Sequence, residues 1–367
     1  MEHEFTSHIY SILEKHFGKS GKTVFENSLL MQYLNEKTRS ANKGSKARGS
    51  FANLYAIYVV IEDYVSKGYL HHGNYSEYEG AVFSKLFARQ RELPFGEKLQ
   101  NHALNNRMNA EFQKYFPNCE YVPILRNLET NRYWINENLL KIHVGKRIVN
   151  IAPMVIEIID DYVATKQDAF HRFVNSCQEM QRVGTNSPQE VESFILGLLV
   201  PNVDARLFEI VSYAILKYHY SDQQIYWGYQ IDKLTKENLQ LFKTGRTNAN
   251  DGGIDFVMRP LGRFFQVTET LDFKKYFLDI DKIQKYPISF VVKTEDSKDK
   301  VFQKIKANAI KSYSITAIVD RYMSCIEEII TIPVLVEYFE QAVKQGYLSH
   351  ILNEIVLQSK IEFNFES

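Results

Sequence analysis

The chain has little cysteine, and its three cysteines lie far apart in the sequence. Cys119, Cys177 and Cys325 form no CxxC pair, so a zinc site of the finger type is not expected, and the odd number fits a reducing cytosol. No run approaches the roughly 18 consecutive apolar residues that a membrane-spanning helix needs. The acidic first residues have no apolar run behind them, which argues against a secretion signal. We therefore expect a cytoplasmic protein with no membrane partner.

An excess of charge of one sign is also absent, because 44 Lys and Arg residues balance 44 Asp and Glu residues. This balance argues against non-specific coating of nucleic acid, yet it allows a local basic face. The hydrophobic fraction of 45% is typical of a soluble globular protein. A chain of 367 residues is long for one core, so we expect two domains or one domain with a large extension.

The best candidate for a domain boundary is the segment from Val183 to Pro188, which contains Gly, Asn, Ser and Pro. Helical patterns dominate before it, with short strands between residues 121 and 144. We therefore predict a mainly helical domain over residues 1–183 and a second domain over residues 184–367.

The second half alternates predicted helices and strands, which is typical of a mixed sheet with helices on both faces. The patterns predict helices over residues 204–220, near 235–242, over 298–312 and over 334–344. They predict strands over residues 224–228, 288–292 and 314–319, together with a β-hairpin over residues 254–269. The expected fold class is α/β, in an α+β mixed arrangement.

The hairpin combines an apolar pattern with a polar pair. Its arms are residues 254–258 and 264–269, and the turn between them contains a proline and a glycine. Because side chains alternate along a strand, Gln266 and Thr268 share the face opposite Phe265. Asp255 lies at the end of the other arm, so carboxylate, amide and hydroxyl oxygens are expected close together. Oxygen atoms of this kind suit a hard cation such as Mg²⁺, with Glu269 as a further possible ligand.

The order Gly-Gly-Ile-Asp-Phe, a short turn and then Phe-Gln-Val-Thr-Glu resembles the PD-(D/E)XK nucleases, especially the Mrr-like and type II restriction endonucleases with Gln in the second position. In that family the Asp, an acid or Gln, and a Lys two residues later hold the metal and the attacking water. By this resemblance Asp255 and Gln266 are the Mg²⁺ ligands. Thr268 stands where the family has its lysine, so the missing group is expected from another residue: Glu269, Lys274, Lys275 or Lys293.

The resemblance implies a PD-(D/E)XK-type mixed sheet flanked by helices in the second half. It also implies Mg²⁺-dependent, sequence-specific hydrolysis of double-stranded DNA. An acid on the preceding helix often joins the metal site in that family, which makes Glu209 a candidate; the alternative is a surface glutamate. A homodimer is expected, since two active sites cut both strands of a palindromic site. The first domain would then recognise DNA and the second would cut it.

Three alternatives remain open. Thr268 in place of a lysine also fits a DNA-binding protein with a degenerate, non-cutting nuclease fold. A nuclease for branched or modified DNA would carry the same pattern. An unrelated α/β protein could contain Asp255 for structural reasons alone.

Two loops have the composition of phosphate-binding segments. Residues 37–49 contain five basic residues, no acid and two glycines, and residues 244–250 lead into the hairpin with Gly, Arg and Asn. The candidate DNA contacts in these loops are Arg39, Lys43, Lys46, Arg48, Arg246, Asn248 and Asn250. The alternative for both loops is a solvated surface. Arg259 and Arg263, beside the hairpin turn, either contact the DNA backbone or keep the turn soluble.

Overall fold

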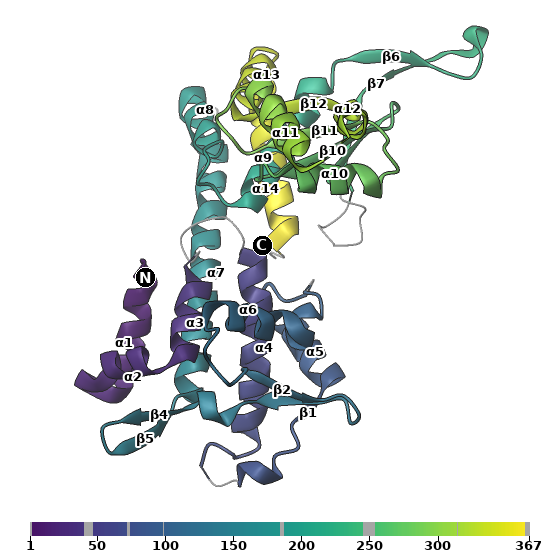
Figure 1. Ribbon diagram of the computed structural model, residues 1–367. Coiled ribbons are helices and arrows are strands. Elements are labelled where there is room, and N and C mark those ends of the chain that lie inside the picture. Colours follow the sequence, from purple (N-terminus) through teal and green to yellow (C-terminus); the bar gives the residue numbers. More distant parts are fainter. Residues whose placement is uncertain are drawn as a thin grey trace. The chain divides into compact units, whose positions relative to one another are not determined.

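A computed structural model describes residues 2–39, 47–71, 74–97, 99–183, 187–244, 254–313 and 315–363. The chain divides into two compact units, Met1–His171 and Arg172–Ser367. The division falls inside helix α7 (Ala152–Val183), whereas the sequence suggested the loop that follows this helix. The helices and several sheets confirm the expected mixed fold class (Figure 1).

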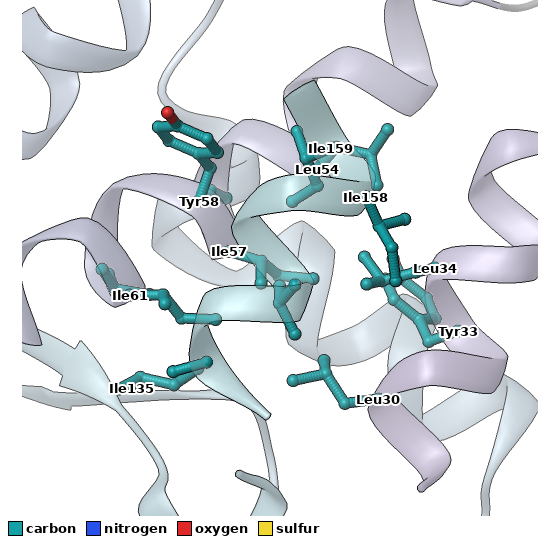
Figure 2. Close-up of a cluster of buried hydrophobic side chains, with 14 of the residues drawn as sticks. Leu30, Tyr33, Leu34, Leu54, Ile57, Tyr58, Ile61, Ile135, Ile158 and Ile159 are labelled. Carbon is teal, nitrogen blue, oxygen red and sulfur yellow. The ribbon is translucent and has the colours of Figure 1, made fainter. Parts of the chain in front are cut away.

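The first unit is mainly helical, as expected. Its helices are α1 (Thr6–Phe17), α2 (Gly21–Asn27), α3 (Leu29–Thr38), α4 (Ala47–Ser66), α5 (Phe83–Glu92), α6 (Met108–Tyr115) and the first part of α7. Helix α4 is apolar over most of its surface, so it lies inside the unit. Figure 2 shows Leu54 and Ile57 on the side of α3 and α7, and Ile61 beside Ile135. A helix with apolar residues on every side is stable only when neighbours cover it, and this burial explains the central place of α4.

Short strands complete the first unit. Strands β1 (Ala81–Val82), β3 (Arg132–Ile135) and β2 (Ile124–Asn127) form a three-stranded sheet in that order. Strands β4 (Lys141–Val144) and β5 (Arg147–Asn150) form a separate antiparallel hairpin. Strands β2, β3 and β4 coincide with the short strands expected between residues 121 and 144, whereas β1 and β5 were not predicted.

The second unit is built on a five-stranded sheet with the order β12-β11-β10-β9-β8. The strands are β8 (Gln240–Lys243), β9 (Phe256–Arg259), β10 (Arg263–Thr268), β11 (Ile288–Val292) and β12 (Ile326–Thr331). Strands β8, β9 and β10 are antiparallel neighbours, and β10, β11 and β12 run parallel. The sheet is therefore mixed, as the alternation of elements predicted, and its β9–β10 hairpin is the predicted one.

Helices cover both faces of this sheet. On one face Phe265 and Val291 pack against α8 (Pro188–Gly197), α9 (Ala205–Tyr220), α13 (Ile332–Lys344) and α14 (Leu348–Phe363). On the other face Phe290 and Val292 pack against α10 (Phe273–Lys282), α11 (Lys298–Ser312) and α12 (Thr316–Met323). We name these the α9 face and the α10 face. No helix in the described ranges is both long and apolar enough to cross a bilayer.

Two predicted elements of the second unit are wrong. The helix expected near residues 235–242 is instead the end of a hairpin formed by β6 (Gln224–Trp227) and β7 (Thr235–Asn238), followed by β8. Leu239 and Leu241 are buried while Gln240 and Phe242 are exposed, which is the alternation of a strand. The strand expected over residues 314–319 falls mostly within α12, where Val319 and Met323 are buried at helical spacing.

Candidate functional site

Four strand ends meet at one end of the five-stranded sheet, and polar side chains gather there. Because β9 runs antiparallel to β8 and β10, its first residues lie beside the last residues of those strands. The amide of Thr244 donates to the carbonyl of Asp255 at 3.0 Å, and the amide of Lys293 donates to the carbonyl of Thr268 at 2.9 Å. The end of the sheet therefore brings together residues that are far apart in the sequence. In mixed and parallel sheets, the ends where parallel strands finish are a common location for binding sites.

Asp255 lies at the start of β9 and is held by the neighbouring strand. Its carboxylate oxygen Oδ2 accepts a hydrogen bond of 2.7 Å from the amide of Val267. The amide of Asp255 donates to the carbonyl of Phe265 at 2.9 Å. These bonds fix the carboxylate beside the backbone of β10 between Gln266 and Thr268. The structure thus brings Asp255 to the strand that carries the other expected ligands.

Gln266 and Thr268 are buried on the α10 face of β10, as the alternation predicted. Asp255, Gln266 and Thr268 are only 8%, 8% and 6% exposed, respectively. The side-chain nitrogen Nε2 of Gln266 donates to the carbonyl of Val267 at 3.1 Å, but its oxygen Oε1 is buried with no hydrogen-bond partner in the described part of the chain. The hydroxyl of Thr268 accepts from the amide of Thr270 at 3.3 Å. A buried oxygen without a partner costs about 1–3 kcal/mol, so such an atom often marks the place of an ion or a water.

Glu269 lies close by but is committed to a different contact. Its carboxylate forms an ion pair with Lys293, which follows β11 and whose side chain is only 4% exposed. The Lys293 ammonium also donates to the carbonyl of Val203 at 2.7 Å, in the segment before α9. Strand alternation places Glu269 and Lys293 on the α9 face, the same face as Phe265 and Val291. Glu269 is therefore not on the face that carries Gln266 and Thr268.

Glu209 is not a freely exposed glutamate. It lies on α9, and its carboxylate oxygen is 2.9 Å from the ammonium of Lys243 at the end of β8. Both side chains are largely buried, with 14% and 13% of their surface exposed. The α9 face therefore carries two Lys–Glu pairs at this end of the sheet: Lys243–Glu209 and Lys293–Glu269.

The other lysines considered as replacements for the motif lysine are arranged differently. Lys274 is exposed on α10. Lys275 forms an ion pair with the fully buried Asp279 one turn along the same helix. Of the three lysines, Lys293 is the one that the backbone ties directly to Thr268.

Most of the expected DNA contacts cannot be placed. Residues 40–46 and 245–253 lie outside the described residues, and these ranges contain Lys43, Lys46, Arg246, Asn248 and Asn250. The same holds for the side chain of Arg48. Arg39 follows the end of α3, is exposed, and lies 3.9 Å from a carboxylate oxygen of Glu36.

Arg263, beside the hairpin turn, makes ionic contacts that the sequence did not suggest. Its guanidinium is 3.3 Å from the carboxylate of Glu327, also pairs with Glu328, and lies 5.0 Å from the ring centre of Phe265. These contacts place it in a network on the α9 face, with Glu327 and Glu328 as its ionic partners. Arg259, in contrast, is exposed.

The donor set at the sheet end fits a hard divalent cation of modest affinity. Asp255 offers a carboxylate, Gln266 a buried oxygen that has no partner among the described residues, and Thr268 a hydroxyl. Mg²⁺ prefers oxygen ligands of this kind. Within the described ranges, no group of three or more His, Cys, Asp and Glu side chains is placed to hold a metal ion. Any ion here would therefore be bound by one carboxylate and neutral oxygens, which attract a cation less strongly than several carboxylates do.

The sequence reasoning missed Lys243 and the carbonyl of Val203. Lys243 ends a strand that was predicted as a helix, so its pairing with Glu209 could not be anticipated. Val203 contributes only a backbone atom, which no side-chain pattern reveals. With this geometry described, comparison of the chain with protein-family models, with curated proteins and with solved structures finds no match.

Proposed function

We propose that this protein is a Mg²⁺-dependent endonuclease that hydrolyses double-stranded DNA at specific sequences, in the manner of a type II restriction enzyme. The observation that carries the proposal is the placement of Asp255 against β10 through the amide of Val267, the residue after Gln266, whose buried Oε1 has no partner among the described residues. Asp255 and Gln266 belong to the two segments of the sequence that resemble the nuclease motif. The rigid neighbouring strands hold the oxygens in place, as a cation site requires.

Each residue of the site has a defined part in this proposal. Asp255 supplies the negative charge, and Gln266 and Thr268 supply neutral oxygens that complete the cation site. When bound, Mg²⁺ would neutralise charge on the scissile phosphate and make a water molecule more acidic. Asp255, Gln266 and Thr268 would hold it, and their fixed positions on β9 and β10 would orient the phosphate.

Thr268 lacks the ammonium group that the resembling nucleases use, and Lys293 is the proposed replacement. Its backbone is bonded to Thr268, and its side chain is nearly buried beside Glu269. To act on the substrate, the ammonium would leave Glu269 on the α9 face and reach around the end of the sheet, where Lys293 follows the last residue of β11, to the phosphate or the attacking water. Lys293→Met should then lower the cleavage rate by roughly 10²–10⁴-fold, the usual contribution of a positioned proton-transfer or charge-stabilising group. Lys274→Met, which changes an exposed lysine on α10, is the matched control.

DNA recognition is assigned to residues 1–183 and cleavage to residues 184–367, with a homodimer as the working unit. A duplex has two strands to cut, and a two-fold symmetric dimer matches a palindromic site.

A DNA-binding protein that does not cut is the second candidate. The absence of a lysine at position 268 favours it, and so does the ion pair that occupies Lys293. The two candidates differ in one measurable respect, because both would shift DNA in a gel but only the first would cleave it.

The deciding experiment is a plasmid digest by the full chain with Mg²⁺ and, in parallel, with EDTA. Discrete bands that require Mg²⁺ support the endonuclease, whereas a mobility shift without cleavage supports the binder. Asp255→Asn keeps an oxygen that can accept from the Val267 amide, so the fold should persist while cleavage is lost. Asp299→Asn, an exposed acid at the start of α11, is the matched control. Full activity of the Asp255→Asn variant would rule the site out.

A further inference from the structure

The β6–β7 hairpin extends away from the sheet and helices of its own unit (Figure 1). In the described part of the chain its strands pair only with each other. Residues 224–238 are exposed, apart from the partly buried Ile225 and Glu237. At the base, the side chain of Asn238 donates to the carbonyl of Ser221 at 2.9 Å. An isolated two-stranded hairpin is only marginally stable in water, so this arm gains from a partner that covers it.

The β6–β7 arm, residues 224–238, carries large apolar side chains that are exposed to solvent. Tyr229 is 101% exposed and Ile231 is 91% exposed, at the tip. The strands and the turn add three more exposed apolar side chains: Tyr226, Trp227 and Leu234. Five large exposed apolar side chains on one short arm are typical of an interaction site.

The charges of the arm argue against the DNA backbone as its partner. Lys233 and Lys236 are balanced by Asp232 and Glu237. A surface that binds phosphates needs a positive excess, because released counterions supply most of the affinity. A neutral, aromatic arm is instead typical of a protein interface.

The two free edges of the hairpin differ in charge, and this difference favours β6 over β7 as the edge that pairs with another strand. The β6 edge, Gln224-Ile225-Tyr226-Trp227, contains no charge and no proline, the features that normally protect an exposed edge from pairing. The β7 edge carries Lys236 and Glu237. Antiparallel pairing of β7 with itself about either residue would place like charges opposite each other, which is unfavourable.

We propose that β6 pairs with β6 of a second copy of this chain across a two-fold axis, so that two hairpins form one four-stranded antiparallel sheet. Pairing centred on Tyr226 places the two Tyr226 side chains opposite each other and each Ile225 opposite Trp227 of the second copy. Aromatic pairs and aromatic–β-branched pairs are favourable across antiparallel strands. In this register Tyr229 lies opposite Gln223 of the second copy, so the tip of each arm covers the base of the other.

Edge-to-edge pairing leaves the two faces of the four-stranded sheet open. The interface therefore gains from main-chain hydrogen bonds and cross-strand side-chain pairs rather than from a large buried area. This inference deepens the proposed function, since it gives the expected homodimer a surface, but it does not depend on cleavage.

The first test measures the mass of the full chain by light scattering after size-exclusion chromatography. The wild type should have the mass of a dimer, and Tyr226→Lys should halve it, because two ammonium groups would meet at the axis. Tyr226→Glu should do the same, and a mixture of the two variants should restore the dimer. Tyr121→Lys, at an exposed tyrosine of the first unit, should leave the dimer intact, and circular dichroism checks that every variant is folded.

The second test is a crosslink. Directly opposed residues of antiparallel strands lie about 4.5–5.5 Å apart, which a disulfide can span. Tyr226→Cys, in a Cys119→Ser background, should form a covalent dimer on mild oxidation. Leu128→Cys, at an exposed position of the first unit, should not.

A monomeric wild type, or a Tyr226→Lys variant that remains a dimer, would overturn the inference. A monomeric wild type in which Tyr226→Lys weakens DNA binding would assign the arm to DNA instead. A dimer that depends on Tyr226 but never cleaves DNA would leave this inference standing and remove the endonuclease proposal.

Discussion

The Lys293–Glu269 pair should show a strong asymmetry when each partner is removed in turn. The Lys293 side chain is 4% exposed and that of Glu269 is 29% exposed. Glu269→Gln leaves an ammonium enclosed at the sheet end with a neutral amide and the Val203 carbonyl. Breaking a buried ion pair from one side in this way typically costs about 3–5 kcal/mol, and we expect the lower end because Glu269 is partly hydrated.

Lys293→Met removes the enclosed charge itself and leaves an apolar chain of similar length. The Glu269 carboxylate can then turn toward water, and the remaining cost is the unpaired carbonyl of Val203. That cost is about 1 kcal/mol, the lower end for a backbone acceptor that loses its partner. Glu269→Gln should therefore destabilise the second unit by about 2 kcal/mol more than Lys293→Met.

The assay is urea denaturation followed by circular dichroism, with the free energy of unfolding taken from the midpoint and slope. Both variants change the same unit, so any contribution of the first unit cancels in the comparison. The double variant should cost about as much as Lys293→Met alone, since no charge then remains enclosed. Equal costs for the two single variants, or a larger cost for Lys293→Met, would refute the reasoning.

Three further predictions concern residues outside the candidate site. Burial lowers the pKa of His219 below its usual 6.5. The unfolded chain therefore binds the proton more readily, and the free energy of unfolding falls as pH decreases below about 6.5. His219→Phe, which keeps a ring against Tyr338, should flatten this decline in urea midpoints measured from pH 7 to pH 5. Arg263→Met leaves the partly buried carboxylate of Glu328 without its cation and should lower the free energy of unfolding by roughly 2–3 kcal/mol in the same urea assay. A decrease below about 0.5 kcal/mol would show that the network is not stabilising. Gly80 has φ +74°, and a Cβ added there would lie 2.6 Å from the carbonyl oxygen of Tyr133. Gly80→Ala should therefore lower the melting temperature more than Gly68→Ala, where φ is also positive but the space is open. Equal decreases in melting temperature would contradict this.

The hairpin at the centre of the site could be predicted because its signals are local. A proline and a glycine between two apolar arms indicate a turn, and alternation alone assigns Gln266 and Thr268 to one face. The bond between the Asp255 carboxylate and the Val267 amide could not be predicted, because a hydrogen bond from a side chain to a neighbouring strand leaves no periodic signal.

The errors arose where distant partners outweighed local preference. Residues 235–242 contain good helix formers, yet β7 pairs with β6, and β8 pairs with β9, which begins at Phe256. Long-range pairing overrides helix propensity in such segments. The contact between Lys293 and Val203, 90 residues apart, is of the same kind, since only the folded sheet brings the two together.

The unpartnered oxygen of Gln266 has a consequence for folding as well as for binding. Any species that fills its hydrogen-bonding or coordination capacity in the native state alone shifts the equilibrium away from the unfolded chain. The stabilisation grows with the logarithm of the concentration of that species, by about 1.4 kcal/mol for each tenfold increase above saturation. Melting curves of this protein in a series of cations would therefore test the proposed cation site without any nucleic acid present.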